Sequence, residues 1–311
     1  MKSFIYKLKF SSVLLTLLIG LFFLSCEKVI DPSLQSASPV LVVDAWVNNK
    51  PEKQLILLTQ TQPYFDDAQP IGVSGAVVTV EDLNDGTIYS FTENSIKKGS
   101  YEWSPGSGSF GAIGHNYKLV ITLNGEVYEA TSHMGRVPPI DSITFQKDER
   151  SASKKTRYQG EFWAVDPEGV GDSYWIRAVK NDTLLNRPSE LNIAYDAGFS
   201  AGGDADGVEF IPPIRRGITP DNSSDADNPS PYWPGDSVYV EMTSITLAAF
   251  NYLNEVKVQT DRPGGFSELF ARPLANVSTN VTNTNPNGSA VMGFFNVGAI
   301  SARGQKFTKV N

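Results

Sequence analysis

Hydrophobic and polar residues alternate along much of this chain, which is typical of β-strands with one buried and one solvated face. Two tight-turn signals interrupt the alternation. Asn84-Asp85-Gly86 separates the segments 76–83 and 87–92, and Asn124-Gly125 separates 117–123 from 126–131. Asp-Gly and Asn-Gly pairs favour the positive φ angles of hairpin turns, so each pair of segments predicts a β-hairpin.

Segments 40–47 and 54–60 are also strand-like, because they are rich in aliphatic residues and are bounded by proline, asparagine or polar residues. Together with the two hairpins they predict a β-sandwich of the immunoglobulin or transthyretin kind over residues 40–137. Pro138-Pro139 marks the expected domain boundary, since two prolines interrupt regular structure.

Residues 138–311 predict a second β-rich domain with long loops and one or two short helices. Its strand-like segments are 140–145, 158–165, 174–181, 238–242 and 290–297. Between them, residues 196–234 form a long irregular stretch, and loops of such length are usually functional or disordered. Residues 245–256 carry apolar residues at helical spacing after Ser244, a residue type that caps helices. The expected fold class is therefore mainly β.

The first residues resemble an export signal. Lys2, Lys7 and Lys9 precede an apolar run, and Ser25 stands directly before Cys26. A charged start, a short apolar centre and a small residue at the cleavage site are the features that secretion machinery recognises. We therefore expect residues 1–25 to be a lipoprotein signal peptide, Cys26 to carry the lipid, and 26–39 to form a tether. Several acyl chains on one residue give a durable membrane anchor.

Charge and cysteine content narrow the function further. The net charge is −8, and it becomes −11 once residues 1–25, which hold three lysines and no acid, are removed. Such an acidic body lacks the basic patches that attract nucleic acids, so we expect no nucleic-acid partner. Cys26 is the only cysteine. Lipidation uses its thiol, which leaves no disulfide and no thiolate for catalysis or metal binding.

Few residues suggest catalysis or a metal. The only histidines are His115 and His133, and no serine lies in a G-x-S-x-G elbow, so we expect a non-enzyme without a cofactor. Asp204, Asp206 and Glu209 resemble part of a calcium loop, but the complete spacing of such a loop is missing. We read these acids as a solvated loop and expect no metal site.

Large aromatic residues in loop-like surroundings are the candidate ligand-binding residues. They are Tyr64, Phe65, Tyr232 and Trp233. Aromatic faces in such places stack on sugars or anchor protein interfaces. Packing against the core beneath a loop is the alternative interpretation, and the sequence leaves both open.

Several stretches of the mature chain resemble a lipoprotein family of the Bacteroidetes group, the domain of unknown function 4249. The stretches that carry the resemblance are 26–31, 39–47, 73–80, the hairpin that begins at Tyr117, 136–143, 172–175 and 235–238. The resemblance implies an outer-membrane lipoprotein, and it implies a TonB-dependent transporter as partner. It carries no catalytic residues. We expect an accessory protein that captures a ligand for such a transporter. The alternative is a free-standing surface lipoprotein that binds glycans or proteins. The sequence leaves open which membrane face the body occupies.

The lipid anchor can be tested on the protein purified from its own membranes. Mass spectrometry should find acylated Cys26 as the first residue, because cleavage and lipidation are coupled at that position. An unmodified thiol at position 26, or residues 1–25 still attached, would contradict the anchor.

Overall fold

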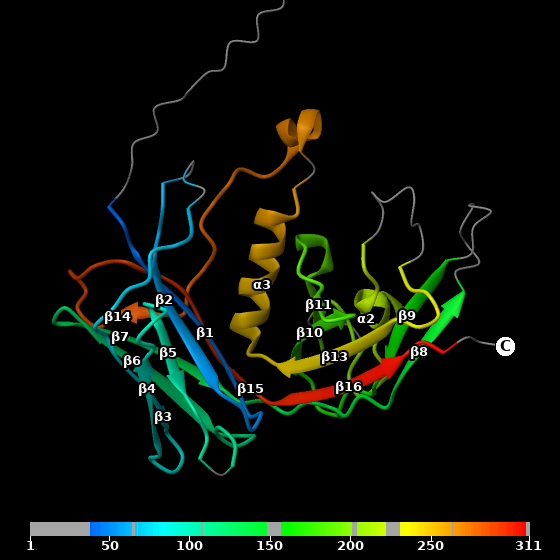
Figure 1. Ribbon diagram of the computed structural model, residues 1–311, viewed down its shortest axis with the longest axis horizontal. Helices are drawn as coiled ribbons and strands as arrows, with labels where there is room; N and C mark the ends of the chain where they lie inside the picture. The colour runs from blue at the N-terminus through cyan, green and yellow to red at the C-terminus, as the bar shows by residue number, and fades with distance from the viewer. Residues whose placement is uncertain are drawn as a thin grey trace, which may run out of the picture. The chain divides into compact units, whose positions relative to one another are not determined.

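The computed structural model describes residues 38–63, 66, 68–106, 108–147, 157–200, 204–221, 231–262 and 264–308 (Figure 1). The expected signal peptide, Cys26 and all but the end of the tether lie outside these residues, as do Tyr64 and Phe65. Residues from Pro39 onward form one compact unit. Within the described part of the chain, no helix combines the length and the apolar character that crossing a membrane requires.

The larger sheet of this unit has nine strands in the order β14-β7-β6-β3-β4-β5-β2-β1-β15. Its strands are β1 (Leu41–Asn48), β2 (Gln54–Gln60), β3 (Val77–Asp82), β4 (Ile88–Glu93), β5 (Ser100–Trp103), β6 (Asn116–Leu123), β7 (Glu126–His133), β14 (Thr282–Asn283) and β15 (Val291–Gly298). The mainly β prediction is confirmed, and so are both predicted hairpins. At the second hairpin turn, Asn124 and Gly125 have φ angles of 51° and 83°, the positive values that this turn requires.

The two ends of the nine-stranded sheet approach each other, so that the sheet nearly closes on itself. Asn280 makes part of this closure: its amide nitrogen donates to the carbonyl of Phe295 at 2.8 Å, and its amide oxygen accepts from the Phe295 N–H at 2.9 Å. The Val297 N–H also donates to Ser132 Oγ of β7 at 2.8 Å. The strands expected to form two packed sheets are therefore joined in one, and the immunoglobulin- or transthyretin-like sandwich is not confirmed.

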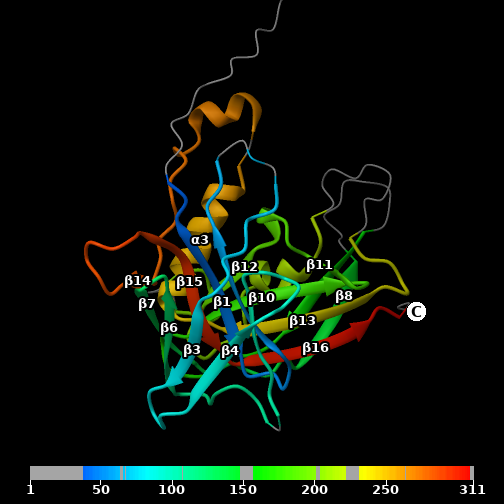
Figure 2. The same cartoon turned by 60° about the vertical axis from the view of Figure 1, so that its left-hand side comes forward.

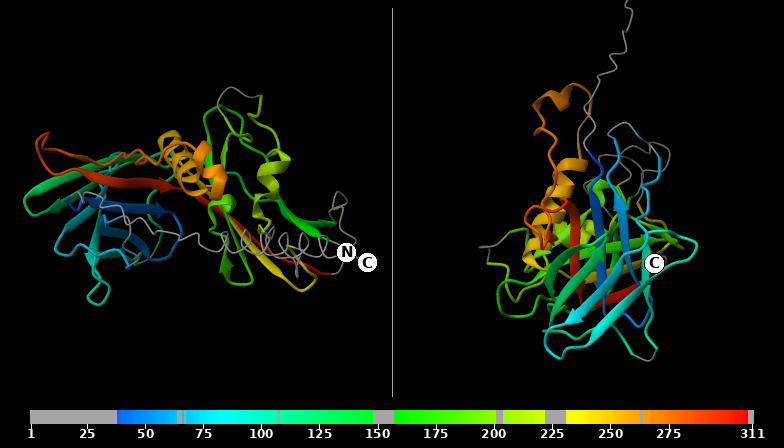
Figure 3. Two further views of the ribbon diagram at one scale, coloured as in Figure 1. Left: turned by 90° about the horizontal axis from the view of Figure 1, so that it is seen from above. Right: turned by 90° about the vertical axis from the view of Figure 1, so that its left-hand side faces the viewer.

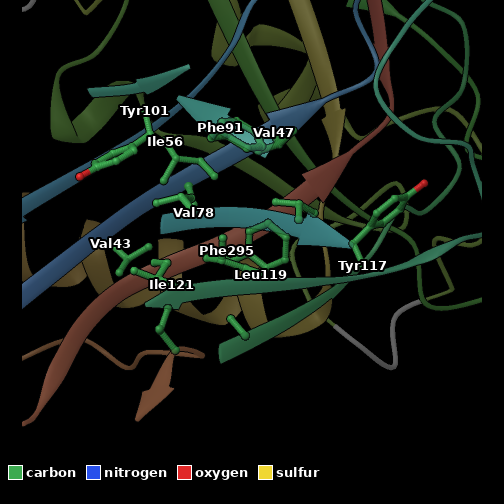
Figure 4. Close-up of a cluster of buried hydrophobic side chains, with 14 of the residues drawn as sticks. Val43, Val47, Ile56, Val78, Phe91, Tyr101, Tyr117, Leu119, Ile121 and Phe295 are labelled. Carbon is green, nitrogen blue, oxygen red and sulfur yellow. The ribbon is translucent and has the colours of Figure 1, made fainter. Parts of the chain in front are cut away.

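Alternate side chains of these strands fill the interior of the sheet. In β1, for example, Val43, Ala45 and Val47 are buried, while the residues between them are partly or fully exposed. Figure 4 shows Val43 and Val47 together with large residues from the neighbouring strands. Full burial of one aliphatic side chain contributes about 1.5–3 kcal/mol. The apolar residues that alternate with polar ones in the sequence thus form one continuous core.

A second sheet has the strand order β11-β10-β13-β16, with β12 also pairing with β10. Its strands are β10 (Ser173–Lys180), β11 (Thr183–Leu184), β12 (Asn192–Tyr195), β13 (Ser237–Ser244) and β16 (Ile300–Lys306). A separate hairpin pairs β8 (Ser142–Lys147) with β9 (Tyr158–Trp163). The helices in the described residues are α2 (Pro212–Arg215), α3 (Leu247–Thr260) and the 3₁₀ segments η1 (Pro188–Glu190), η2 (Arg216–Ile218) and η3 (Gly265–Phe270). Figure 2 shows the second sheet with α3 above it.

The predicted helix is confirmed, but it begins at Leu247, two residues later than the predicted start at Ile245. Thr246 is the cap, and its hydroxyl accepts from the Ala249 N–H at 3.1 Å. Ser244 cannot cap the helix because it ends β13, where its hydroxyl donates to the Gly135 carbonyl at 2.8 Å. The helix buries Ala249, Phe250 and Leu253 on one face.

The last long strand of the nine-stranded sheet comes from the C-terminal part of the chain. β15 pairs in parallel with β1, and Ala299 alone separates β15 from β16. β14 likewise pairs with β7. The expected division into 40–137 and 138–311 did not allow for these pairings, because nothing local in the sequence states which strands become neighbours.

Gly293 in β15 shows how closely β15 packs against β1. Its φ angle is +98°, and a Cβ atom there would lie 1.9 Å from the Val43 carbonyl oxygen of β1. Gly293→Ala should therefore lower the free energy of unfolding by about 3 kcal/mol or more, measured by urea denaturation.

Gly75→Ala is the matched control, because Gly75 also has a positive φ of +81° but has no atom within 4 Å of the added Cβ. It should cost only about 1–2 kcal/mol, the price of the backbone conformation alone. Equal losses in the two variants would show that β15 does not pack against β1 in this way.

Candidate functional site

A groove of about 560 Å³ opens at one edge of the nine-stranded sheet. Following the register from strand to strand, the His133 end of β7 lies at the same edge as the Asn48 end of β1, and Leu41 lies at the opposite edge. The groove is formed by the residues after β7, by the loop before β10 and by the start of α3. In Figure 1 the start of α3 is the lower end of that helix, next to the end of β13.

The start of α3 is fixed to β15 and β10. The Thr246 N–H donates to Asn296 Oδ1 at 3.1 Å, and the Ile245 N–H donates to the Ser173 carbonyl at 2.8 Å. Further along the helix, Tyr252 contacts Phe294, so α3 runs from the groove toward the edge at which β1 begins. The seen-from-above view in Figure 3 shows α3 lying alongside β15.

The groove combines an apolar rim with a few polar groups. Ile113, Val170 and Leu247 line it with exposed fractions of 54, 78 and 48 %. Ser173 also lines the groove; it is buried, and its hydroxyl has no hydrogen-bond partner among the described residues. Apolar walls with a small number of placed polar groups are typical of ligand-binding pockets.

One wall of the groove is the loop from Asp166 to Asp172, and Arg136 holds it from one side. Arg136 Nε donates to Asp172 Oδ2 at 2.8 Å, and Arg136 Nη2 donates to the carbonyl of Gly169 at 2.7 Å and to that of Pro167 at 3.2 Å. A charged, planar guanidinium with three partners fixes geometry better than a single neutral hydrogen bond does.

Three carboxylates hold the same loop from the other side. Asp196 Oδ1 accepts from the N–H groups of Gly171 and Asp172 at 2.8 and 3.0 Å, and Asp206 Oδ1 accepts from the Gly169 N–H at 2.8 Å. Asp166 Oδ1 accepts from the Tyr174 hydroxyl at 2.6 Å. The loop is thus held rigid before any ligand arrives, which lowers the entropic cost of binding.

Asp166, Asp196 and Asp206 form a carboxylate cluster, in which one oxygen from each lies within 4.8 Å of the others. Asp166 and Asp196 are buried. Burial, together with the charges of Asp172 and Asp196, raises the pKa of Asp166 to about 6. Either a proton or a divalent cation could neutralise this cluster, since hard cations prefer carboxylate oxygens.

A second group with suitable atoms for a metal is Asp82, Asp85 and His115. His115 Nδ1 lies 2.8 Å from Asp82 Oδ2. Burial acts to raise the pKa of Asp82, but hydrogen bonds from His115 and from the Asn84 N–H outweigh it and leave that pKa below its usual value. The other histidine, His133, contacts Asn116. Both histidines thus have structural partners among the described residues.

The residues singled out from the sequence are separated in the structure. Of the three loop acids, only Asp206 joins the carboxylate cluster, since Asp204 is exposed and Glu209 pairs with Arg215 at 3.0 Å. Tyr232 is completely buried and its hydroxyl contacts the Ile218 carbonyl, which is the core-packing alternative left open above. Trp233 is 40 % exposed and stays a candidate for ligand contact.

The sequence did not lead to a prediction that Arg136, Asp166, Asp172 and Asp196 belong to a functional site. A signal was present in Asp166-Pro167-Glu168-Gly169-Val170-Gly171-Asp172, where acids flank a glycine-rich turn. Nothing in the sequence around Asp196 indicates its role, because Asp196 is distant from this loop along the chain and contacts it only in the folded protein. It adopts a positive φ of 48°, which aspartate tolerates better than most residues.

Two stretches that carried the family resemblance, 136–143 and 172–175, meet in this site through the Arg136–Asp172 ion pair. The family model described as a domain of unknown function (DUF4249) matches residues 27–303. The chain belongs to the DUF4249 family. The match spans the nine-stranded sheet, the groove and the carboxylate cluster of this DUF4249 protein, so they all lie within the family domain. No curated protein matches the chain.

The raised pKa of Asp166 predicts a stability that depends on pH. Between about pH 4 and 6 the folded DUF4249 protein binds more protons than the unfolded chain, so its free energy of unfolding should fall as pH rises through that window. Asp166→Asn keeps an acceptor for Tyr174 and removes the charge. In buffers with a chelator, it should exceed the original protein in stability at pH 7.5 by on the order of 1–2 kcal/mol, and by much less at pH 4.

Asp204→Asn is the control, because it removes an equal charge from an exposed site outside the cluster. Its urea midpoint should follow that of the original protein at every pH. A constant difference between Asp166→Asn and the original protein from pH 4 to 7.5 would show that Asp166 has an ordinary pKa.

Proposed function

We propose that this protein is a lipid-anchored accessory protein of the outer membrane, which captures a ligand in the groove and passes it to a TonB-dependent transporter. The observation that carries the proposal is the position of the groove. It opens at the edge of the nine-stranded sheet opposite the edge at which β1 begins. A chain anchored through its first residues would thus present the groove away from its attachment.

The tether supports this arrangement by its length. Residues 26–39 precede β1, and a fully extended chain spans at most about 3.3–3.6 Å per residue, so fourteen residues could reach at most about 45–50 Å. This reach lets the body turn its groove toward a neighbouring protein while Cys26 stays in the membrane. The acyl anchor, the cleavage of 1–25 and the transporter are parts of the proposal that the sequence motivates.

Two exposed phenylalanines also support an orientation in which the groove faces away from the membrane. η3 follows α3 and lies beyond the upper end of that helix, on the side of the sheet where β1 begins, as Figures 1 and 2 show. In it, Phe266 and Phe270 are 76 and 79 % exposed and their rings lie 5.7 Å apart. Paired aromatic rings at the edge nearest the tether suit contact with a lipid surface.

The alternative function is a free-standing lipoprotein that binds glycans or proteins at the cell surface. Trp233 favours it, since 40 % of this residue is exposed just before β13. Loss of binding on glycan arrays in a Trp233→Ala variant, with no transporter recovered, would favour the alternative.

Co-purification tests the transporter partnership. The tagged, lipidated protein is extracted from its own cells in mild detergent, and recovered proteins are identified by mass spectrometry. The original protein should recover a TonB-dependent transporter. Val170→Asp, which places a charge on the apolar rim, should lower that recovery about tenfold if the rim contacts the partner.

Ile96→Asp is the matched control, because Ile96 is 92 % exposed and lies in the turn between β4 and β5, outside the groove. It should recover as much transporter as the original protein. Failure of the original protein to recover any transporter would refute the partnership, and equal recovery with both variants would refute contact through the rim of the groove.

A further inference from the structure

A second cavity, of about 230 Å³, lies between the two large sheets and shares no lining residue with the groove. Residues of β1, β2, β10, β13 and β15 line it, together with the turn between β1 and β2. The side chains that matter for its chemistry are Trp46, Asn48, Gln54, Trp175, Arg177 and Thr243. The cavity therefore combines two indole rings with hydroxyl, amide and guanidinium groups.

The two tryptophans are held in place from behind. Trp46 and Trp175 meet edge to face, with ring centroids 5.0 Å apart and planes inclined by 65°. On another side, Trp46 stacks on Phe294 at 5.9 Å and contacts Tyr252 at 6.3 Å. Both tryptophans are half-buried, so they are rigid and still reach the cavity. Fixed aromatic faces bind an apolar ring face at little entropic cost.

The strongest sign of a missing ligand is the hydroxyl of Thr243. Thr243 is only 6 % exposed, and its Oγ1 has no hydrogen-bond partner among the described residues. Arg177 Nε is also buried and unpartnered in that part of the chain, although Arg177 Nη2 pairs with Glu241. Buried polar groups are nearly always paired, so two unpaired ones beside a cavity indicate a partner that the cavity holds.

Other polar side chains are already engaged in shaping the cavity. The Gln54 amide donates to the carbonyl of Glu52 at 3.1 Å and holds the turn between β1 and β2. Glu241 pairs with both Arg177 and Lys50, so the positive charge of Arg177 is largely neutralised. Glu52 and Lys53 also line the cavity, but they pair with Lys50 and Glu102. The groups left for a ligand are thus a hydroxyl, an N–H of Arg177 and the rings, which suits a neutral molecule rather than an anion.

We propose that this cavity binds one neutral pyranose unit of a glycan. A pyranose has an apolar C–H face that stacks on tryptophan and a rim of hydroxyls that both donate and accept hydrogen bonds. The Arg177 guanidinium lies over the Trp175 ring, 4.8 Å from its centroid. The sugar face therefore packs on the part of the two indole rings that lines the cavity beside Arg177, while ring hydroxyls pair with Thr243 Oγ1 and Arg177 Nε. The volume lies below the about 300–1,000 Å³ of drug-sized pockets, which suits a single ring. This site is separate from the groove and does not depend on the transporter.

The test uses the mature lipidated protein in detergent micelles and a panel of glucose, galactose, mannose and N-acetylglucosamine. Saturation-transfer NMR and tryptophan fluorescence report binding. At least one sugar should bind with a dissociation constant on the order of 1 mM, with the strongest saturation on the protons of its apolar face. If no sugar in the panel binds, the proposal is overturned.

Thr243→Val is the decisive variant, because valine has nearly the same shape and lacks the hydroxyl. It should weaken the sugar about three- to tenfold while the free protein becomes no less stable, since the lost hydroxyl has no partner there. Trp175→Ala should abolish binding. Undiminished affinity in Thr243→Val would overturn the proposed contact.

Phe199→Ala is the control, since Phe199 is 56 % exposed and lies outside this cavity. It should leave the affinity unchanged. If Trp233→Ala abolishes sugar binding while Thr243→Val does not, the sugar site lies at Trp233 and the cavity is not the site. Because these measurements involve no second protein, their failure is distinct from a failure to recover a transporter.

Discussion

The parallel pairing of β1 with β15 is the interaction on which the rest of this structure depends. It places the first and the second-to-last strands of the described chain side by side over eight residue pairs, from Leu41 and Val291 to Asn48 and Gly298. One residue later the chain begins β16, so the same segment enters both large sheets. Ala299 at this junction is buried, and its N–H donates to Ser244 Oγ. Asn296 of β15 lines the second cavity, and its Oδ1 accepts from the N–H of Thr246, which lines the groove.

The elements that could be predicted from the sequence are those with local causes. The Asn124-Gly125 turn requires positive φ angles that few other pairs adopt, and α3 follows from apolar residues at helical spacing. β16 was missed because all its residues after Ser301 are exposed, so no alternation marks it. The nearly closed nine-stranded sheet could not be predicted, since the choice of β15 as neighbour of β1 depends on contacts some 250 residues apart.

The candidate site was predicted less well, for a related reason. Asp206 was noticed because it stands among other acids in the sequence, yet its partners Asp166 and Asp196 come from separate segments. Tyr232 looked like a surface aromatic because its neighbours are polar and proline-rich, but it fills the core. Trp46 and Trp175 were read only as strand residues, and their approach to 5.0 Å is a property of the fold. In each case the sequence shows the type of the residue, but it does not show which residues lie close to one another in the fold.

The position of β15 near the C-terminus has a consequence for the folding of the protein during its synthesis. A polypeptide that emerges from its N-terminus cannot complete the sheet begun by β1 until residue 298 has been delivered. Until then the outer edge of β1 offers unpaired N–H and C=O groups, which are prone to incorrect pairing with other chains. The nascent chain must therefore be kept apart from such partners until β15 is in place, and a product shortened by its final twenty residues would remain open to proteases.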